Sequence, residues 1–225
     1  MNNLYKKFDA RLSALLRHLV PCNTTADVGC DHGLVSLYIL DANISNNVVC
    51  IDISPKCLQK TQNLLQKTKL QDRAVFLQSD GLHGTEEILI DQVVIAGMGG
   101  INISNILKAM PKSSDNARLI LQPMNNITMV RKTLNNLNKA IIRDEIIFDK
   151  NKYYHIIVAQ NGKQKLTKQQ VRCGAVTEDY RSADYQKWLD LKIKKVESII
   201  NGIPKDNEKY PEFIEYLNDL KKCKF

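Results

Sequence analysis

Two carboxylates and two glycines lie close together in one short segment, where they could hold a small ligand. The segment reads Ala-Asp-Val-Gly-Cys-Asp-His-Gly, with alternate positions occupied by Asp27, Gly29, Asp31 and Gly33. A turn that binds a dinucleotide needs Gly-x-Gly-x-x-Gly, so that the backbone can approach a pyrophosphate. Here Asp31 and Leu34 stand at the other two glycine positions, and a carboxylate in such a pocket would repel a phosphate. The pattern Asp-x-Gly-x-x-x-Gly instead matches a cationic ligand without phosphate, such as S-adenosylmethionine.

Two further carboxylates follow at spacings that suit the same ligand. Asp52 ends the next apolar run, 23 residues after Gly29, and an acidic residue about 20 residues past a glycine turn can accept both ribose hydroxyls. Asp80 ends a third run, where it could accept from an adenine amino group, and Gly81 would allow a close approach. A single glycine pair is also typical of an ordinary turn, and an acidic residue after a strand often caps a helix. Their joint occurrence at these spacings favours a nucleoside cofactor.

A glycine-rich loop follows a fourth apolar run. Residues 93–100 read Val-Val-Ile-Ala-Gly-Met-Gly-Gly, which ends with three glycines in four positions. Such a loop lets a flat base and a reactive methyl group come close to the backbone. A tight turn before a helix is the alternative, but three glycines exceed what a turn needs. We therefore predict that this loop belongs to the reaction site.

These residues require a fold that brings the ends of several strands together. Short apolar runs are typical of buried strands, and they occur at residues 26–29, 48–52, 74–77, 93–97 and 119–121. Helical patterns occur at residues 8–20, 33–41, 54–68, 102–110 and 126–138. This alternation predicts an α/β fold with a parallel sheet covered on both faces. Residues 140–148 and 153–160 predict a β-hairpin at one end of the sheet, which makes seven strands in all. Ser54 is expected to cap the helix that begins at Pro55.

The character of the chain changes after Gly162. Residues 163–177 are polar and predict no element, whereas two helical stripes of apolar residues follow. The first stripe comprises Tyr185, Leu189, Ile193, Val196, Ile200 and Ile203, and the second Phe213, Tyr216, Leu217 and Leu220. We predict a helical hairpin whose apolar seam, including Trp188, packs on itself. The expected domains are therefore residues 1–162 and 163–225.

Three motifs resemble those of the bacterial TrmK family. They are Ala-Asp-Val-Gly-Cys-Asp-His, Ile-Ala-Gly-Met-Gly-Gly and Leu-Ile-Leu-Gln-Pro, the second being quite specific. Members of that family are tRNA (adenine-N1)-methyltransferases acting at position 22. The resemblance implies a Rossmann-like class I methyltransferase fold with a mostly parallel seven-stranded sheet, a coiled-coil-like C-terminal hairpin and S-adenosyl-L-methionine as the cofactor. The implied cofactor-binding residues are Asp27, Gly29, Cys30, Asp31, His32, Asp52, Ile53, Asp80, Gly81, Ala96, Gly97, Met98 and Gly99.

The chemistry of this methyl transfer suggests which residues act on the target base. Methylation of adenine N1 leaves a cation on the ring, which a carboxylate would stabilise; Asp31 and Asp80 are the nearest candidates. Met98, Gln122 and Tyr154 are the candidates that contact the base, and with Asp31 they form the predicted catalytic set. His32 could be a general base, although a structural role, in which it forms a hydrogen bond within the turn, is favoured.

Two positions depart from the family pattern. An Asn follows the proline of the third motif in the family, whereas Met124 follows it here and Asn125 comes one residue later. Cys30 stands where a serine is common, and because both side chains are small we expect the turn to accept it. The first departure leaves open which polar side chain, if any, acts after Pro123.

Composition and charge narrow the class of protein. No apolar run approaches the ~20 residues that span a bilayer, and no apolar segment follows Lys6 and Lys7, so no signal peptide is expected. The six cysteines form no Cys-x-x-Cys pair, which predicts free thiols in the cytoplasm and no metal site.

The net charge of +8 favours a polyanionic binding partner, although surface lysines can also serve solubility alone. We expect tRNA phosphates to contact lysines and arginines of residues 1–20 and 163–224. The sequence does not define an oligomeric state, and a monomer is favoured.

Three alternatives remain open at this stage. A methyltransferase of the same fold could act on another RNA, a small molecule or a protein. A nicotinamide-dependent oxidoreductase is disfavoured by Asp31 and the missing glycine. A catalytically inactive RNA-binding protein with a methyltransferase fold would share the same sequence features.

Overall fold

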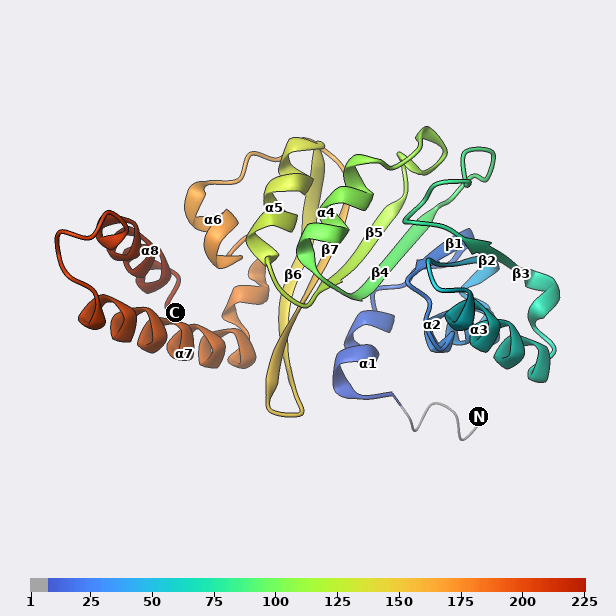
Figure 1. The fold of residues 1–225 in the computed structure, drawn as a ribbon, viewed down its shortest axis with the longest axis horizontal. Coiled ribbons are helices and arrows are strands. Elements are labelled where there is room, and N and C mark those ends of the chain that lie inside the picture. The colour runs from blue at the N-terminus through green and yellow to red at the C-terminus, as the bar shows by residue number, and fades with distance from the viewer. Residues whose placement is uncertain (1–7) are drawn as a thin grey trace.

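A computed structural model describes residues 8–225 of the chain, so Lys6 and Lys7 lie outside the described residues. Seven strands form one sheet in the order β3-β2-β1-β4-β5-β7-β6 (Figure 1). The strands from β3 to β5 in this order are parallel, whereas β7 runs antiparallel to β5 and to β6. The bounds are β1 Cys22–Val28, β2 Ser45–Asp52, β3 Ala74–Gln78, β4 Gln92–Met98, β5 Arg118–Pro123, β6 Lys139–Asp149 and β7 Lys152–Asn161. The predicted mostly parallel, seven-stranded α/β sheet is confirmed.

Helices cover both faces of this sheet because strand residues alternate between the two faces. Val93 and Ile95 of β4 pack with α4 and α5 in one apolar cluster, and Val94 packs with α1 in another. The helices α2 and α3 cover the same face as α1, against β2. Figure 1 shows α4 and α5 in front of the strands and the C-terminal helices extending to one side. The bounds are α1 Ala10–Leu16, α2 Leu34–Asp41, α3 Pro55–Lys67, α4 Gly100–Lys108, α5 Ile127–Asn136, α6 Lys168–Cys173, α7 Ala183–Gly202 and α8 Tyr210–Lys222.

The first strand begins earlier than its apolar residues indicate. Thr25 is fully buried, yet its hydroxyl is hydrogen-bonded to the Ser45 hydroxyl at 2.5 Å and to the Gln92 amide at 3.2 Å. Because these polar side chains satisfy one another, they can occupy interior strand positions. The helix expected at residues 8–20 is also shorter in the structure, where it spans Ala10–Leu16.

Two predicted helix starts differ in detail from the structure. Ser54 occupies the position before α3 and Pro55 its first turn, but the Ser54 side chain makes no capping hydrogen bond. The expectation of a Ser54 side-chain cap is therefore wrong; its amide instead donates to Asp52 Oδ1 at 2.9 Å. The helix expected at residue 102 begins at Gly100, where an added Cβ would lie 2.5 Å from the Asn125 carbonyl oxygen. The absence of a side chain therefore lets this helix start against the loop after β5.

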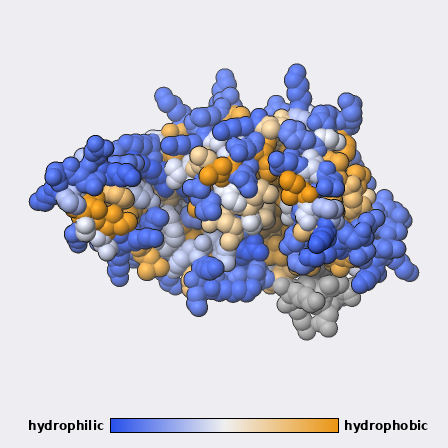
Figure 2. All heavy atoms as spheres, in the orientation of Figure 1, coloured by the Kyte–Doolittle hydropathy of each residue, from blue (hydrophilic) through white to orange (hydrophobic). Residues whose placement is uncertain are grey.

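The C-terminal part forms the expected helical hairpin and one further helix. The polar stretch contains α6, which starts with a reciprocal capping box between Thr167 and Gln170. The seam between α7 and α8 buries an apolar cluster that also contains Ile146 of β6, with Trp188 packed against it. Figure 2 shows hydrophilic side chains over most of this face, with one apolar patch over the C-terminal helices and others over the middle and right of the molecule.

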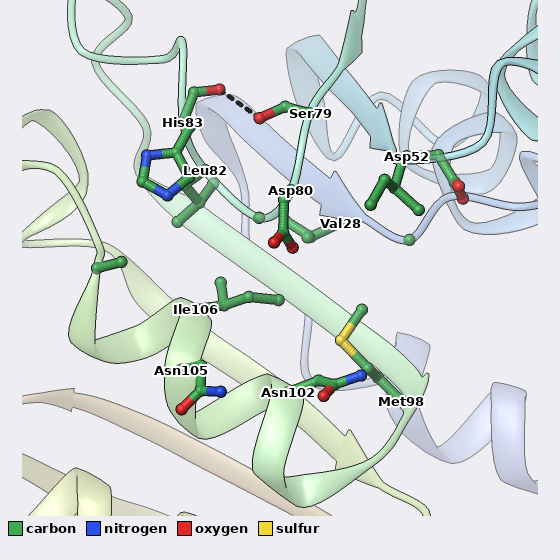
Figure 3. Close-up of a pocket in the computed structure, with 14 residues that line it drawn as sticks. Val28, Asp52, Ser79, Asp80, Leu82, His83, Met98, Asn102, Asn105 and Ile106 are labelled. Atoms are coloured by element: carbon green, nitrogen blue, oxygen red, sulfur yellow. Dashed lines mark hydrogen bonds between the residues drawn. The ribbon is translucent and has the colours of Figure 1, made fainter.

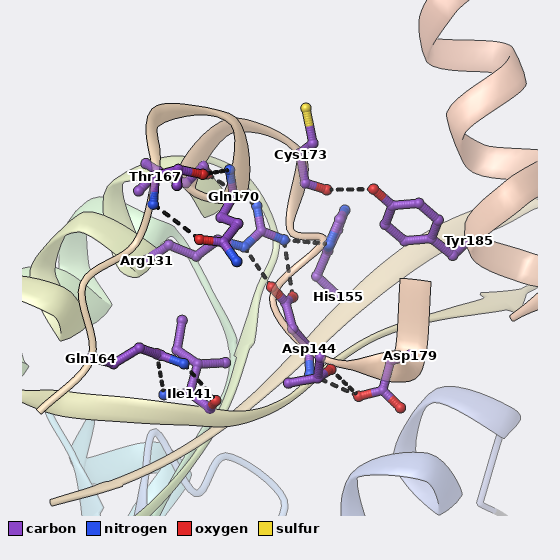
Figure 4. A network of polar contacts seen from close by, with 12 residues as sticks. Arg131, Ile141, Asp144, His155, Gln164, Thr167, Gln170, Cys173, Asp179 and Tyr185 are labelled. Atoms are coloured by element: carbon purple, nitrogen blue, oxygen red, sulfur yellow. Dashed lines mark hydrogen bonds and ion pairs between the residues drawn. The ribbon is translucent and has the colours of Figure 1, made fainter. Parts of the chain in front are cut away.

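A buried ion pair joins α5 to β6 (Figure 4). Arg131 donates to both carboxylate oxygens of Asp144, at 2.8 and 3.0 Å, and the two side chains are only 2% and 1% exposed. The guanidinium also donates to the Val171 carbonyl at 3.4 Å and lies 3.4 Å from Nδ1 of His155. The absence of a side chain at Gly174 makes room, because a Cβ there would lie 2.2 Å from Arg131 Nη2. Through the Val171 carbonyl, the pair therefore connects α6 to α5 and β6.

Candidate cofactor site and glycine loop

The turn after β1 depends on left-handed backbone conformations. Gly29 has φ +75°, Asp31 φ +43° and Gly33 φ +70°. A Cβ at Gly33 would lie 2.7 Å from Cγ2 of Thr61 in α3, so glycine is required both for conformation and for space. The Thr61 hydroxyl donates to the Asp31 carbonyl at 3.1 Å. The turn is thus held against α3 with its carboxylates at the end of the strand.

Asp27 supports this turn from beneath. One of its oxygens, Oδ2, accepts the Ser36 hydroxyl at 2.6 Å and the Ser36 amide at 3.1 Å, within the first turn of α2. Burial raises the pKa of Asp27 to about 6, even though both Ser36 hydrogen bonds favour the charged form. Asp27 does not line the pocket described next, so in this structure it anchors α2.

A pocket of about 430 Å³ opens at the carboxyl ends of β1, β2, β3 and β4 (Figure 3). Six of the predicted cofactor residues line it, namely Gly29, Asp52, Ile53, Asp80, Gly81 and Met98. Residues that the sequence analysis did not identify complete the wall, namely Val28, Ser79, Leu82, His83, Asn102, Asn105, Ile106 and Ala109. Asn102 and Asn105 are three residues apart on the helix that follows the glycine loop, so their shared helix face is the signal that could have identified them.

Two carboxylates, those of Asp52 and Asp80, bring negative charge to the pocket. Asp52 accepts the Asp31 amide at 3.2 Å on Oδ2 and the Ser54 amide at 2.9 Å on Oδ1, which orients its carboxylate. Asp80 projects from the loop after β3 toward the centre of the cavity (Figure 3). Among the described residues that line the pocket there is no lysine or arginine. Such a pocket suits a cationic ligand with hydroxyl and amino donors and opposes a pyrophosphate.

Other predicted cofactor residues lie outside the lining. Cys30 is buried, and burial raises the pKa of its thiol to about 12, so the thiol is neutral. Asp31 and His32 have side chains that are 59% and 62% exposed, with His32 Nε2 3.5 Å from Asp31 Oδ2. Ala96 and Gly97 belong to the end of β4, whose last residue, Met98, lines the pocket, and Gly99 follows it.

Gln122 holds the glycine loop in place. Its side-chain oxygen accepts the Gly97 amide at 3.1 Å and the Arg11 guanidinium at 2.8 Å. The residue is fully buried, so its oxygen is directed into the protein. Gly97 has φ +75°, and a Cβ there would meet nothing within 4 Å. The space beside Gly97 is therefore open, and Gln122 positions the loop that borders it.

The segment after Pro123 supports the same loop from the other side. The Met124 amide donates to the Met98 carbonyl at 2.9 Å, and its side chain is exposed. Asn125 accepts the Gly100 amide on Oδ1 at 3.2 Å. The polar side chain one residue later than in the family pattern thus contacts the start of α4. Tyr154 lies apart from the pocket, with its ring 5.6 Å from Cζ of Arg11.

The sheet order, the glycine turn and the two pocket carboxylates together define a Rossmann-like methyltransferase domain. Among residues 8–225, no group of three or more His, Cys, Asp or Glu side chains is arranged to hold a metal ion. No helix in the same range is long and apolar enough to cross a membrane.

Comparison with known proteins agrees with this class. The methyltransferase domain family matches residues 8–157. A Mycoplasma genitalium protein, MG248, provisionally named a tRNA methyltransferase, is 32% identical over 152 residues, 66% of this chain and 67% of that protein. The tRNA (adenine(22)-N(1))-methyltransferase of Bacillus subtilis is 29% identical over 163 residues, 72% of this chain and 68% of that enzyme. The structure of M. capricolum TrmK in complex with S-adenosyl-homocysteine aligns with a TM-score of 0.86 at 22% identity, covering 96% of each chain. The chain belongs to the methyltransferase domain family and, within it, to the TrmK family that its motifs predicted.

Proposed function

We propose that this protein transfers a methyl group from S-adenosylmethionine to N1 of adenine 22 in tRNA. The observation that carries the proposal is the pocket at the strand ends, where Asp52 and Asp80 lie beside the glycine loop that follows β4. The relative that is named for this reaction supports the choice of substrate.

The pocket residues fit the cofactor by charge and by hydrogen bonding. Asp52 is placed to accept from ribose hydroxyls, as an acidic residue at the end of the second strand does in nucleotide-binding folds. Asp80 is placed to accept from the adenine amino group, with Gly81 at φ +70° permitting close approach. Ile53, which is 69% exposed, lines the same pocket and would be covered by a bound adenine ring. When bound, S-adenosylmethionine supplies a methyl group already activated by a sulfonium.

The chain's own residues then have to position the base and exclude water. N1 lies on the pairing edge of adenine, so the base must be turned out of its stack to reach Met98 and the open space beside Gly97. In the transfer, the N1–methyl bond forms as the sulfur–methyl bond breaks, and the positive charge passes to the adenine ring. Asp31, exposed beside Asp52, is the carboxylate we assign to stabilising that charge. Gln122 acts through Gly97 as a positioning residue.

The tRNA, a polyanion, would bind a surface on which many basic side chains already form ion pairs with carboxylates. Lys168 pairs with Glu215, Lys221 with Glu197 and Lys224 with Asp190, at 2.6 to 2.9 Å. These pairs are exposed and therefore weak, so phosphates can compete for the lysines. We infer that the domains divide at residues 162 and 163 and that the C-terminal domain extends the tRNA contact. We also infer that the protein acts as a monomer in the cytoplasm, which the absence of a membrane-spanning helix in residues 8–225 allows.

The proposal is tested by incubating the purified protein with labelled S-adenosylmethionine and bulk tRNA, followed by mapping of the modified nucleoside. We expect label in tRNA as N1-methyladenosine at position 22. Label in small metabolites, or a modified base other than adenine, would overturn the assignment. A protein that binds tRNA but never the cofactor would indicate an inactive RNA-binding relative.

A further inference from the structure

A second cavity, of about 700 Å³, lies at the carboxyl end of β5, between the β6–β7 hairpin and α7. Five of its eleven lining residues carry aromatic rings, and we call it the aromatic groove after them, namely Phe148, Tyr153, Tyr154, His155 and Trp188. It includes Tyr154, a predicted base-contacting residue, and Met124, whose amide is bonded to Met98.

The rings of the groove support one another, and all except the buried His155 remain partly accessible. Phe148 and Tyr153 have ring centroids 4.9 Å apart, and Trp188 meets His155 edge to face at 5.1 Å. Phe148 is nevertheless 44% exposed, and Met124 on the rim is 49% exposed. Large apolar side chains that stay exposed around a cavity are typical of a binding surface. Stacking on a nucleic-acid base would cover such rings, because every base presents a flat face.

The charge of the groove indicates an anionic occupant. Lys152 is a lining residue, and among the described residues of the groove there is no carboxylate. His155 adds no charge, because its burial and the nearby Arg131 hold its pKa well below the ordinary value. The cofactor pocket has the opposite character, with Asp52 and Asp80 in its wall. An aromatic surface with one cation suits a base together with its phosphate.

The groove is next to the reaction site but separate from it. The two cavities share no lining residue. Between them, the Met124 amide is bonded to the Met98 carbonyl at 2.9 Å. An attacking nitrogen has to come within about 3–3.5 Å of the methyl carbon, which a base seated beyond this backbone contact cannot do. The groove is therefore suited to a neighbour of the target base.

We propose that the aromatic groove binds an unpaired nucleotide adjacent to the target adenine, stacking its base on Phe148 and contacting its phosphate through Lys152. The inference rests on the proposed function, because it takes tRNA as the substrate. By holding the neighbouring nucleotide, the groove would keep the strand open beside the adenine that is turned out. It would thereby select tRNAs whose nucleotides next to position 22 can be unstacked.

Kinetics of two groove variants test the proposal. Phe148→Ala is expected to raise the KM for tRNA by about tenfold, the effect of losing one base–aromatic stack, with kcat and the Kd for S-adenosylmethionine unchanged. Lys152→Ala is expected to raise KM less and to reduce the salt dependence of tRNA binding by about one phosphate contact. Val75→Ala and Lys67→Ala are the matched controls, since both residues are exposed and lie outside both cavities. Thermal unfolding of all four variants establishes that they are folded.

Photochemical cross-linking identifies the nucleotide. tRNA is prepared with 4-thiouridine at one of the two nucleotides on either side of position 22, and cross-linked peptides are sequenced. We expect a cross-link to the peptide containing residues 148–155. If the wild type methylates tRNA but folded Phe148→Ala keeps the wild-type KM, or cross-links map only outside the groove, this inference is wrong and the proposed function stands. A wild type that does not methylate tRNA overturns both.

Discussion

The side-chain oxygen of Gln122 accepts the backbone amide of Gly97 at 3.1 Å, which ties the end of β5 to the glycine loop. Gln122→Leu removes that acceptor and leaves the Gly97 amide and the Arg11 guanidinium without it. We expect a loss of about 1–3 kcal/mol in the free energy of unfolding and a fall in kcat of up to roughly 100-fold, because small misplacements of a reaction loop are costly. Denaturant titration and steady-state kinetics measure the two effects.

Gln122→Glu is the control for this prediction. It keeps an oxygen that can accept from Gly97 and Arg11, so it should retain much more activity than Gln122→Leu. Equal activity in the two variants would contradict the positioning role.

Asp52 is the pocket carboxylate whose orientation the structure fixes most clearly, through the amides of Asp31 and Ser54. Asp52→Asn removes a charged acceptor, so we expect the Kd for S-adenosylmethionine to rise by about 10- to 100-fold. Calorimetric titration measures this change. Asp72→Asn, which alters a carboxylate before β3 and outside the pocket, should leave the Kd unchanged. A wild-type Kd in Asp52→Asn would exclude the assigned contact.

Asp27 gives the stability of the protein a dependence on pH. Burial raises its folded pKa from 3.8 to about 6, so the folded state binds the proton more tightly than the unfolded state does. Protonated Asp27 therefore adds about 3 kcal/mol to the free energy of unfolding. This contribution is fully present below pH about 4 and is lost as the pH rises through about 6. Asp27→Asn cannot ionise and keeps an acceptor for Ser36. Relative to this variant, the wild type should lose unfolding free energy between these pH values, which denaturant titration at each pH measures. The same dependence on pH in both proteins would contradict the assignment.

The Arg131–Asp144 pair should contribute far more than the surface ion pairs. Arg131→Met leaves the Asp144 carboxylate buried without its partner, which should cost about 3–5 kcal/mol of unfolding free energy. Arg143→Met is the control, because Arg143 pairs with Asp179 while 48% exposed, and its loss should cost at most about 1 kcal/mol. Denaturant titration compares them. The double variant Arg131→Met/Asp144→Leu should recover stability relative to Arg131→Met alone, and no recovery would indicate that packing rather than charge dominates.

The periodicity of the chain predicted most of the fold. Runs such as Val93–Ile95 are continuous because parallel strands are buried on both faces, and this pattern is local. The first half of β1 was not predicted, because its residues are polar. Thr25 is compatible with the interior only when Ser45 and Gln92 are beside it to form hydrogen bonds. α6 was missed because it is six residues long and its capping box lies in a polar stretch.

The sequence by itself determined that Asp52 and Asp80 lie at the carboxyl ends of strands near a glycine turn, Asp52 as the last residue of β2 and Asp80 in the loop after β3, because parallel strands place these ends at one edge. Only the tertiary structure decided which side chains face the ligand. Asp27 lies in the same motif yet is turned toward Ser36, and Gln122 is turned inward by an arginine 111 residues away in the chain. Side-chain direction at a strand end depends on partners distant in sequence, and such contacts leave no local pattern to read.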